Sequence, residues 1–351
     1  MNDFITLFSQ AIEQLRLAAV NVPGLAPLAD APFLFRPLVM VVLLGVVAGV
    51  IGVIINLRSA EFSAEAMVHA IFPGIVAGAV YWGINAIIPA ASVVAVAAAL
   101  VLTLVSHRSR RGEASEAGTA VVLTSFFSIG LILSLAKGDM SGQLEALMFG
   151  RLLEVTDERL AQALIVCAVA LVLIMTTWKE QIAYAFDRTG ARASGLRLLA
   201  LDLALNTAIA AAVVSASTAV GTLLVIGYLV IPGATARILV SRVRTMVLVA
   251  IGVGVGGGYL GMLLMALPAT LDKPISPQAS VALVMTAILL LAVGVTAARE
   301  RLRRPARRAR SAQSAQVLTT TARSADSCAA SPDESASTEG AAVPMAEGSR
   351  A

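Results

Sequence analysis

Glu65 and His69 are the residues of this chain whose types and spacing best suit chemistry. They are four positions apart, so on a helix their side chains lie on one face, one turn from each other. Carboxylate and imidazole groups are ligands that suit Zn²⁺ or Mn²⁺. One chain supplies too few ligands to hold a divalent ion, whereas a symmetric dimer would supply each residue twice. The pair is therefore a candidate metal site completed by a second copy. The alternative is a histidine capped by a neighbouring carbonyl in a bundle core.

Two prolines mark further special points in apolar sequence. Pro73 follows His69 by four positions, and Pro232 stands four positions after Tyr228. A proline in a helix removes one backbone hydrogen bond and clashes with the carbonyl four residues earlier. Broken helices at membrane depth are tolerated where they line a cavity. We therefore predict a helix break at each proline, with a simple packing kink at Pro232 as an open alternative.

The composition identifies the setting of these residues. The chain has 351 residues, of which 58% are hydrophobic and 14% charged, with a mean hydropathy of +0.85. Soluble domains carry roughly 25% charged residues. The net charge of +4 resides in basic links and the tail, which indicates membrane topology rather than nucleic-acid binding. Two cysteines do not suggest a disulfide framework.

Apolar segments long enough to cross a bilayer recur along the chain. A span needs about 20 apolar residues, and nine segments meet that length, the second being short. We therefore predict an all-α, polytopic transmembrane helical bundle of about nine spans. Eight spans remain possible, because the second, sixth and seventh segments could include a re-entrant piece. The segments are 34–56, 66–83, 87–106, 117–136, 160–178, 198–217, 220–239, 246–268 and 277–298.

The basic residues orient this bundle. They follow the third, fifth, seventh and ninth spans, and cytoplasmic links carry an excess of Lys and Arg. Nine spans then place the N-terminus outside and the C-terminus in the cytoplasm. We expect three regions: an amphipathic N-terminal segment at the membrane surface (1–32), a transmembrane domain (33–298), and a disordered cytoplasmic tail (299–351). The tail is too poor in apolar residues to fold alone.

Several other motifs have a structural explanation. A G-x-G-x-x-G pattern at 252–257 lies inside an apolar span without a preceding strand, so we interpret its glycines as helix-packing residues. The pairs Gly45/Gly49 and Gly74/Gly78 belong to the same class. His107 and Asp202 stand at span boundaries and are interpreted as interfacial and helix-end residues. The sequence contains neither a P-loop nor an H-E-x-x-H motif, which disfavours an ATPase and a zinc hydrolase.

Together, these residues form a pattern that resembles a known family. Arg58, Glu65, His69 and the run Pro73–Gly74 are similar to the R-x6-D-x3-H-A-x2-P-G motif of permease subunits of bacterial metal-chelate uptake ABC transporters, the zinc, manganese and iron class. The stretches 147–156 and 220–237 resemble two further motifs of that family. The resemblance covers roughly residues 35–297. Two departures are Glu65, where the family usually has Asp, and Arg151, where an acid is usual.

The resemblance implies a permease rather than an enzyme, in a bacterial plasma membrane. Such a subunit works as a homodimer or paired permease with a cytoplasmic ATP-binding subunit and an extracytoplasmic metal-binding protein. No cofactor is held permanently; the divalent metal is the substrate, and ATP binds the partner. Carried over by motif, Glu65 and His69 form a transient translocation site. The segment 183–197, with Gly190 and Gly195, corresponds to the ATPase-docking loop.

Two other functions compete with this hypothesis. An ion-coupled secondary metal transporter would need no ATPase, but it should show an internal repeat with paired broken helices, and none is convincing around Pro73 and Pro232. An intramembrane protease would need a paired acid or a Ser/His set within the spans. The spans offer only Glu65 and His69.

Overall fold

The computed structural model describes residues 2–22, 24–108, 112–136, 150, 152–266, 276–299 and 301. The chain divides into two compact units, Met1–Thr296 and Ala297–Ala351, and nearly all described residues belong to the first. The regular structure of the described residues is helical. The helices are α1 (Asn2–Val20), α2 (Ala26–Ala29), α3 (Pro32–Arg58), α4 (Glu61–Ala70), α5 (Phe72–Ala77), α6 (Ile87–Arg108), α7 (Gly112–Leu135), α9 (Asp157–Thr176), α10 (Trp178–Phe186), α11 (Arg188–Ala193), α12 (Leu198–Val220), α13 (Thr222–Leu239), α14 (Val243–Ala266) and the helix Pro277–Arg299.

Each predicted span corresponds to one helix, except the second, which consists of several helical pieces. Eight helical segments in the described part of the chain are long and apolar enough to cross a membrane, and α13, the predicted seventh span, has a shorter apolar stretch at Leu224–Leu239. The second span, Glu61–Trp82, consists of α4, α5 and a π-helical turn, Gly78–Trp82. The predicted all-α transmembrane bundle is therefore confirmed. The tail from 302 onward lies outside the described residues.

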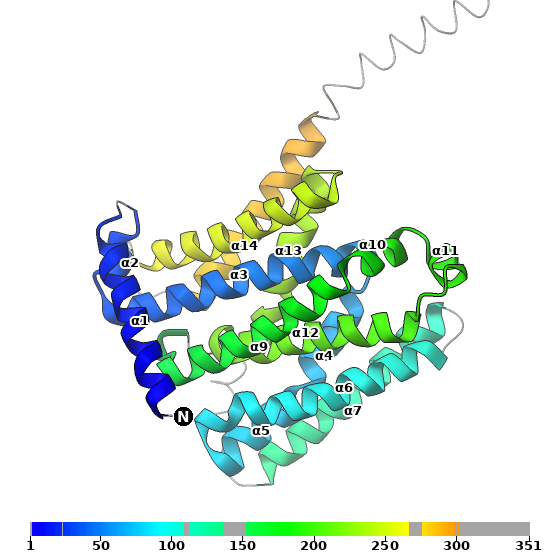
Figure 1. The fold of residues 1–351 in the computed structure, drawn as a ribbon, viewed down its shortest axis with the longest axis horizontal. Helices are drawn as coiled ribbons and strands as arrows, with labels where there is room; N and C mark the ends of the chain where they lie inside the picture. The colour runs from blue at the N-terminus through cyan, green and yellow to red at the C-terminus, as the bar shows by residue number, and fades with distance from the viewer. Residues whose placement is uncertain are drawn as a thin grey trace, which may run out of the picture. The chain divides into compact units, whose positions relative to one another are not determined.

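Helix α3 is the centre of the first unit. Its sequence is apolar on every side, as expected of a helix buried within a bundle. It packs against α14, α13, α9 and α12, and Figure 1 shows it lying between α14 and α9. Because α3 contacts so many helices, its two ends are well placed to connect distant parts of the chain.

Glycines allow close approach at the crossings of α3. A Cβ at Gly45 would lie 2.6 Å from the backbone nitrogen of Val255, and one at Gly254 would lie 2.6 Å from the carbonyl oxygen of Gly45. On the next face, Gly52 and Gly233 bring α3 and α13 together in the same way. The packing role inferred for Gly45 and Gly254 is therefore confirmed, whereas a Cβ at Gly252 would meet no atom within 4 Å.

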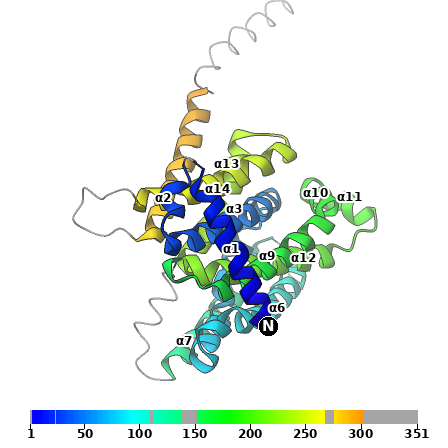
Figure 2. The same ribbon diagram turned by 60° about the vertical axis from the view of Figure 1, so that its left-hand side comes forward.

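Helix α1 is attached to one end of the bundle. It packs beside α9 and α3 (Figure 2), with Phe8 and Ile12 against the core. The hydroxyl of Ser9 donates to a carboxylate oxygen of Asp157 at 3.0 Å, and Asp157 is also paired with Arg36 at the start of α3. Polar contacts thus fix the N-terminal segment at the end of the bundle where α3 begins.

Candidate functional site

Glu65 and His69 lie on one face of α4. The Glu65 side chain is exposed in the isolated chain, and His69 is half-buried. The imidazole Nδ1 of His69 lies 3.0 Å from the backbone oxygen of Glu65. Because that oxygen can only accept, the contact fits a proton on Nδ1, and in the neutral ring Nε2 is then the nitrogen that could coordinate a metal. Metal-binding histidines are commonly oriented in this way, with the other ring nitrogen donating to a carbonyl.

Aromatic rings hold the imidazole from the side. The ring of Phe127 on α7 meets that of His69 edge to face, with centroids 5.6 Å apart. Phe127 also lies against Phe72, with centroids 5.2 Å apart. These contacts pack against the imidazole, and no hydrogen bond to its Nε2 is found among the described residues. A capping carbonyl, the competing interpretation of His69, is present as well, and it orients the ring without occupying Nε2.

The chain is interrupted just beyond this pair. Helix α4 ends at Ala70 and α5 begins at Phe72, with Pro73 in the first turn of α5, where a missing N–H is tolerated. Pro73 is buried. A Cβ at Gly130 of α7 would lie 3.0 Å from the nitrogen of Pro73. Glycine at position 130 therefore lets α7 approach the interruption closely.

The described residues alone do not complete a metal site. Among the described residues, no group of three or more His, Cys, Asp or Glu side chains could hold a metal ion. Glu65 is nevertheless an acid exposed on a membrane span, and ionisable residues within spans face a bundle interior or a water-filled cavity. Within the described residues, the arrangement can present one carboxylate and one imidazole nitrogen to an ion.

Pro232 differs from its predicted role. It lies inside α13, which runs through it from Thr222 to Leu239 without a break. The neighbouring Gly233 packs against Gly52, and the amide of Asn56 donates to the backbone oxygens of Gly52 and Val230. Pro232 thus lies in a continuous helix beside a close α3–α13 crossing, which fits the alternative of a packing position.

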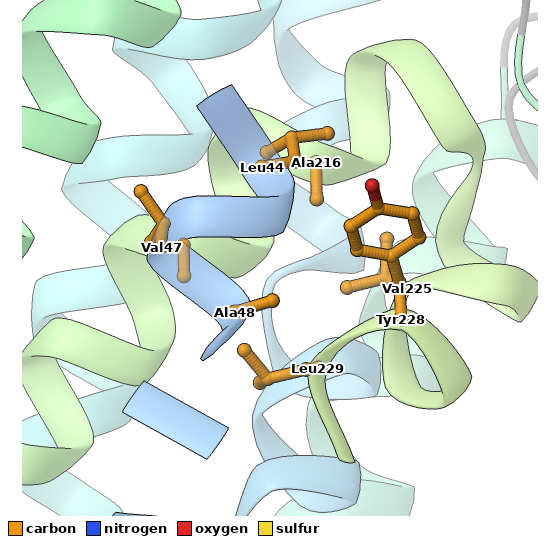
Figure 3. Close-up of a pocket in the computed structure, with 8 residues that line it drawn as sticks. Leu44, Val47, Ala48, Ala216, Val225, Tyr228 and Leu229 are labelled. Carbon is orange, nitrogen blue, oxygen red and sulfur yellow. The ribbon is translucent and has the colours of Figure 1, made fainter. Parts of the chain in front are cut away.

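A small pocket lies beside this crossing and is not a metal site. Figure 3 shows Tyr228 facing side chains of α3 and α12 across it. The Tyr228 hydroxyl already donates to the backbone oxygen of Val41 at 2.8 Å and lies 3.2 Å from that of Gly254. The remaining lining side chains are apolar and offer a cation no ligand. They are Leu44, Val47, Ala48, Ala212, Ala216, Val225 and Leu229.

The segment 183–197 forms the end of α10, the short helix α11 and the turn that follows. The Asp187 carboxylate caps α11 by accepting from the backbone N–H groups of Thr189 and Gly190, both at 2.9 Å. A Cβ at Gly190 would collide with that carboxylate. Gly195 is exposed, has φ +79°, and a Cβ there would meet no atom within 4 Å. The turn at Gly195 is thus open to a partner.

A polar cluster that the sequence did not reveal lies beside this segment. We name it the Arg58 cluster: Arg58, His107, Gln181, Tyr184 and Asp202. The Arg58 guanidinium pairs with the Asp202 carboxylate, which also lies 3.2 Å from Nε2 of His107. His107 and Asp202 do lie at helix ends, as predicted, but bundle packing also brings them together with Arg58, which the sequence interpretation missed. The predicted order of the spans puts Arg58, His107 and Asp202 on the same side of the membrane, and this was the signal that the sequence offered for their contact.

Comparison with known proteins fits this architecture. The model of the ABC 3 transport family matches residues 30–296. The manganese transport system membrane protein MntC of Listeria monocytogenes is 33% identical over 231 residues, which are 66% of this chain and 80% of that protein. The chelated iron transport system membrane protein YfeC of Yersinia pestis is 32% identical over 212 residues, 60% of this chain and 70% of that one.

A solved structure shows the same fold. A chain of PsaBC from Streptococcus pneumoniae in complex with Fab superposes with a TM-score of 0.65 at 24% identity, covering 77% of this chain and 94% of that chain. The family match spans the bundle from α3 to the helix Pro277–Arg299, with Glu65 and His69 inside it. The chain is a multi-pass permease that belongs to the ABC 3 transport family, which confirms the family predicted from its motifs.

Proposed function

We propose that this chain is the membrane-spanning permease subunit of an ATP-binding-cassette importer that moves Mn²⁺, Zn²⁺ or Fe²⁺ into the cytoplasm. The single observation that carries the proposal is the Glu65–His69 pair on a membrane span, with Nε2 of His69 free to coordinate. The family match and the manganese and iron transport relatives support the substrate class. The chain holds no cofactor permanently, and ATP binds a separate subunit.

The site requires a second permease copy. Two copies related by an axis beside α4 supply two carboxylates and two imidazoles, which suit Zn²⁺ or Mn²⁺. A second copy also covers the exposed Glu65, which lipid cannot solvate. Transport requires the ion to leave again, so the site holds the ion weakly, unlike a closed structural cage.

Two further partners act at opposite ends of the bundle. The ATP-binding subunit docks on the segment 183–197. Gly190 allows the tight cap by Asp187 there, and Gly195 leaves the backbone accessible. An extracytoplasmic metal-binding protein delivers the ion at the end where α3 begins. The chain is thus a multi-pass plasma-membrane protein with a cytoplasmic C-terminus, embedded in lipid, and it performs no ATP hydrolysis itself.

The competing hypothesis is an ion-coupled secondary transporter. The family match favours the ATP-driven importer. Uptake of Mn²⁺, Zn²⁺ and Fe²⁺ should be measured in vesicles that contain the permease, its ATPase and its binding protein. We expect uptake of at least one ion to require ATP and to stop when the ATPase is inactivated. Uptake that an ion gradient drives without the ATPase would overturn the proposal.

A further inference from the structure

The turn between α3 and α4 connects the end of α3 directly to the helix of the candidate metal site. Only Ser59 and Ala60 separate the two helices. Ser59 adopts φ +51° and bonds through its N–H to Ile55, and the N–H of Ala60 also reaches the Ile55 oxygen, at 2.9 Å. The turn is short and hydrogen-bonded, so a displacement of Arg58 displaces the start of α4.

The Arg58 side chain is held by three other groups. It is only 9% exposed. Its guanidinium donates to Oε1 of Gln181 at 2.6 Å, pairs with Asp202, and lies 4.0 Å from the centroid of the Tyr184 ring. Gln181 and Tyr184 belong to α10, and Asp202 belongs to α12. One buried cation therefore joins the end of α3 to the helix that leads into the segment 183–197; Figure 1 shows α10 beside the end of α3.

Other contacts complete the connection around Asp202. The Tyr184 hydroxyl donates to the Asp202 carboxylate at 3.4 Å, and the side-chain amide of Gln181 donates to the Leu201 oxygen at 2.8 Å. Burial raises the pKa of Tyr184, so its hydroxyl keeps the proton it donates. These hydrogen bonds and the Arg58–Asp202 ion pair join α10, α12 and the end of α3.

We propose that Arg58 is a positioning residue that transmits movement of α10 to α4, and thereby to Glu65 and His69. The inference rests on the proposed function, because it assigns the coupling between the ATPase-docking segment and the translocation site. At a rise of about 1.5 Å per residue, Glu65 and His69 lie about 6 and 12 Å along α4 from Glu61. A shift of the Arg58 cluster therefore reaches both ligands through one short, rigid helix.

The alternative is that the cluster only stabilises the fold. The opposite end of α3 offers a matched control, because Arg36 there also pairs with an aspartate, Asp157. Both arginines stand on the same helix and join it to another span. Only the Arg58 pair contacts α10. If such pairs act solely as anchors, removing either should have the same kind of effect on transport.

The experiment measures metal taken up per ATP hydrolysed in vesicles containing permease, ATPase and metal-binding protein. We expect Arg58→Gln to lower this ratio by about tenfold, within the range usual for coupling between distant sites. ATP hydrolysis and subunit assembly should stay near parent levels. Arg36→Gln should leave the ratio unchanged. Equal ratios in Arg58→Gln and the parent would overturn the inference.

A second pair of variants applies if Arg58→Gln fails to assemble. Tyr184→Leu removes the ring that the guanidinium covers, whereas Tyr184→Phe keeps it and loses only the hydroxyl bond. We expect the ratio to fall in Tyr184→Leu and to be largely kept in Tyr184→Phe. Unchanged ratios in both variants would overturn the role of the cluster. A parent complex that moves none of the three metals would instead overturn the proposed function itself.

Discussion

At the scale of single residues, His69 is the position where sequence and geometry agree most closely. Its spacing from Glu65 predicted a shared helix face, and the structure places both residues on α4 with Nδ1 of His69 3.0 Å from the Glu65 backbone oxygen. The contacts of Phe127 could not be predicted, because they arise where α7 packs on α4. Sequence spacing gives neighbours within one helix and says little about neighbours from another.

His69→Ala should abolish metal uptake, because it removes an imidazole nitrogen from each copy. The variant should still assemble with the ATPase, since the ring is only half-buried and makes one backbone hydrogen bond. Uptake into reconstituted vesicles and co-purification of the ATPase measure the two effects. Glu116→Gln, at an exposed acid near the start of α7, is the control and should transport normally. Transport by His69→Ala at the parent rate would make His69 a packing residue.

Glu65→Asp should keep uptake and change the order of preferred metals. The charge is retained, but the carboxylate moves back by one methylene, so the distance to a shared ion changes. Competition between Mn²⁺, Zn²⁺ and Fe²⁺ for uptake measures the order. Glu65→Gln, which removes the charge at unchanged length, should lose most uptake. The assignment fails if Glu65→Gln transports as well as the parent.

At the scale of elements, glycines decide how closely the helices approach. Gly45→Leu would force a side chain into the backbone of α14, and overpacking of this kind costs about 1–3 kcal/mol or more. Gly252→Leu is the matched control, because a Cβ there meets no atom within 4 Å. Thermal unfolding in detergent should show a lower midpoint for Gly45→Leu only. Equal midpoints would contradict the packing role of Gly45.

The proposed docking segment 183–197 can be tested separately at Gly195. Its left-handed φ of +79° strains any side chain, while the open space beyond it suits a partner surface. Gly195→Ala and Gly195→Leu incur similar backbone strain but differ in bulk. We expect the leucine variant to lose uptake per ATP hydrolysed well beyond the alanine variant. If the two are equally impaired, backbone conformation alone explains Gly195.

At the scale of the whole molecule, hydropathy was sufficient to predict the helical bundle but not the side-chain contacts that join its helices. Eight of the nine apolar segments became helical spans because each is long and apolar in itself, and the remaining one, α13, has a shorter apolar stretch. The Arg58 cluster was missed because Arg58 and Asp202 are 144 positions apart, and only the packing of α3, α10 and α12 brings them together. Contacts between residues this far apart in the sequence leave no pattern in the local sequence around either residue.

The orientation of the chain in the membrane is the last prediction. Arg36 with Asp157 and Arg58 with Asp202 lie at the two ends of α3 and therefore on opposite sides of the bilayer. The Lys and Arg pattern assigns the Arg58 end to the cytoplasm, because basic links are retained there. The segment 183–197 is then cytoplasmic, and α1 is outside.

Single cysteines test this orientation in a chain whose Cys167 and Cys328 have been replaced. Asn21 at the end of α1 and Thr189 in α11 are both exposed, so either can carry the label. A membrane-impermeant maleimide should modify Asn21→Cys in intact spheroplasts and Thr189→Cys only after permeabilisation. The reverse pattern would invert the bundle, remove the segment 183–197 from the reach of a cytoplasmic ATPase, and leave the Arg58 cluster without a docking helix to follow.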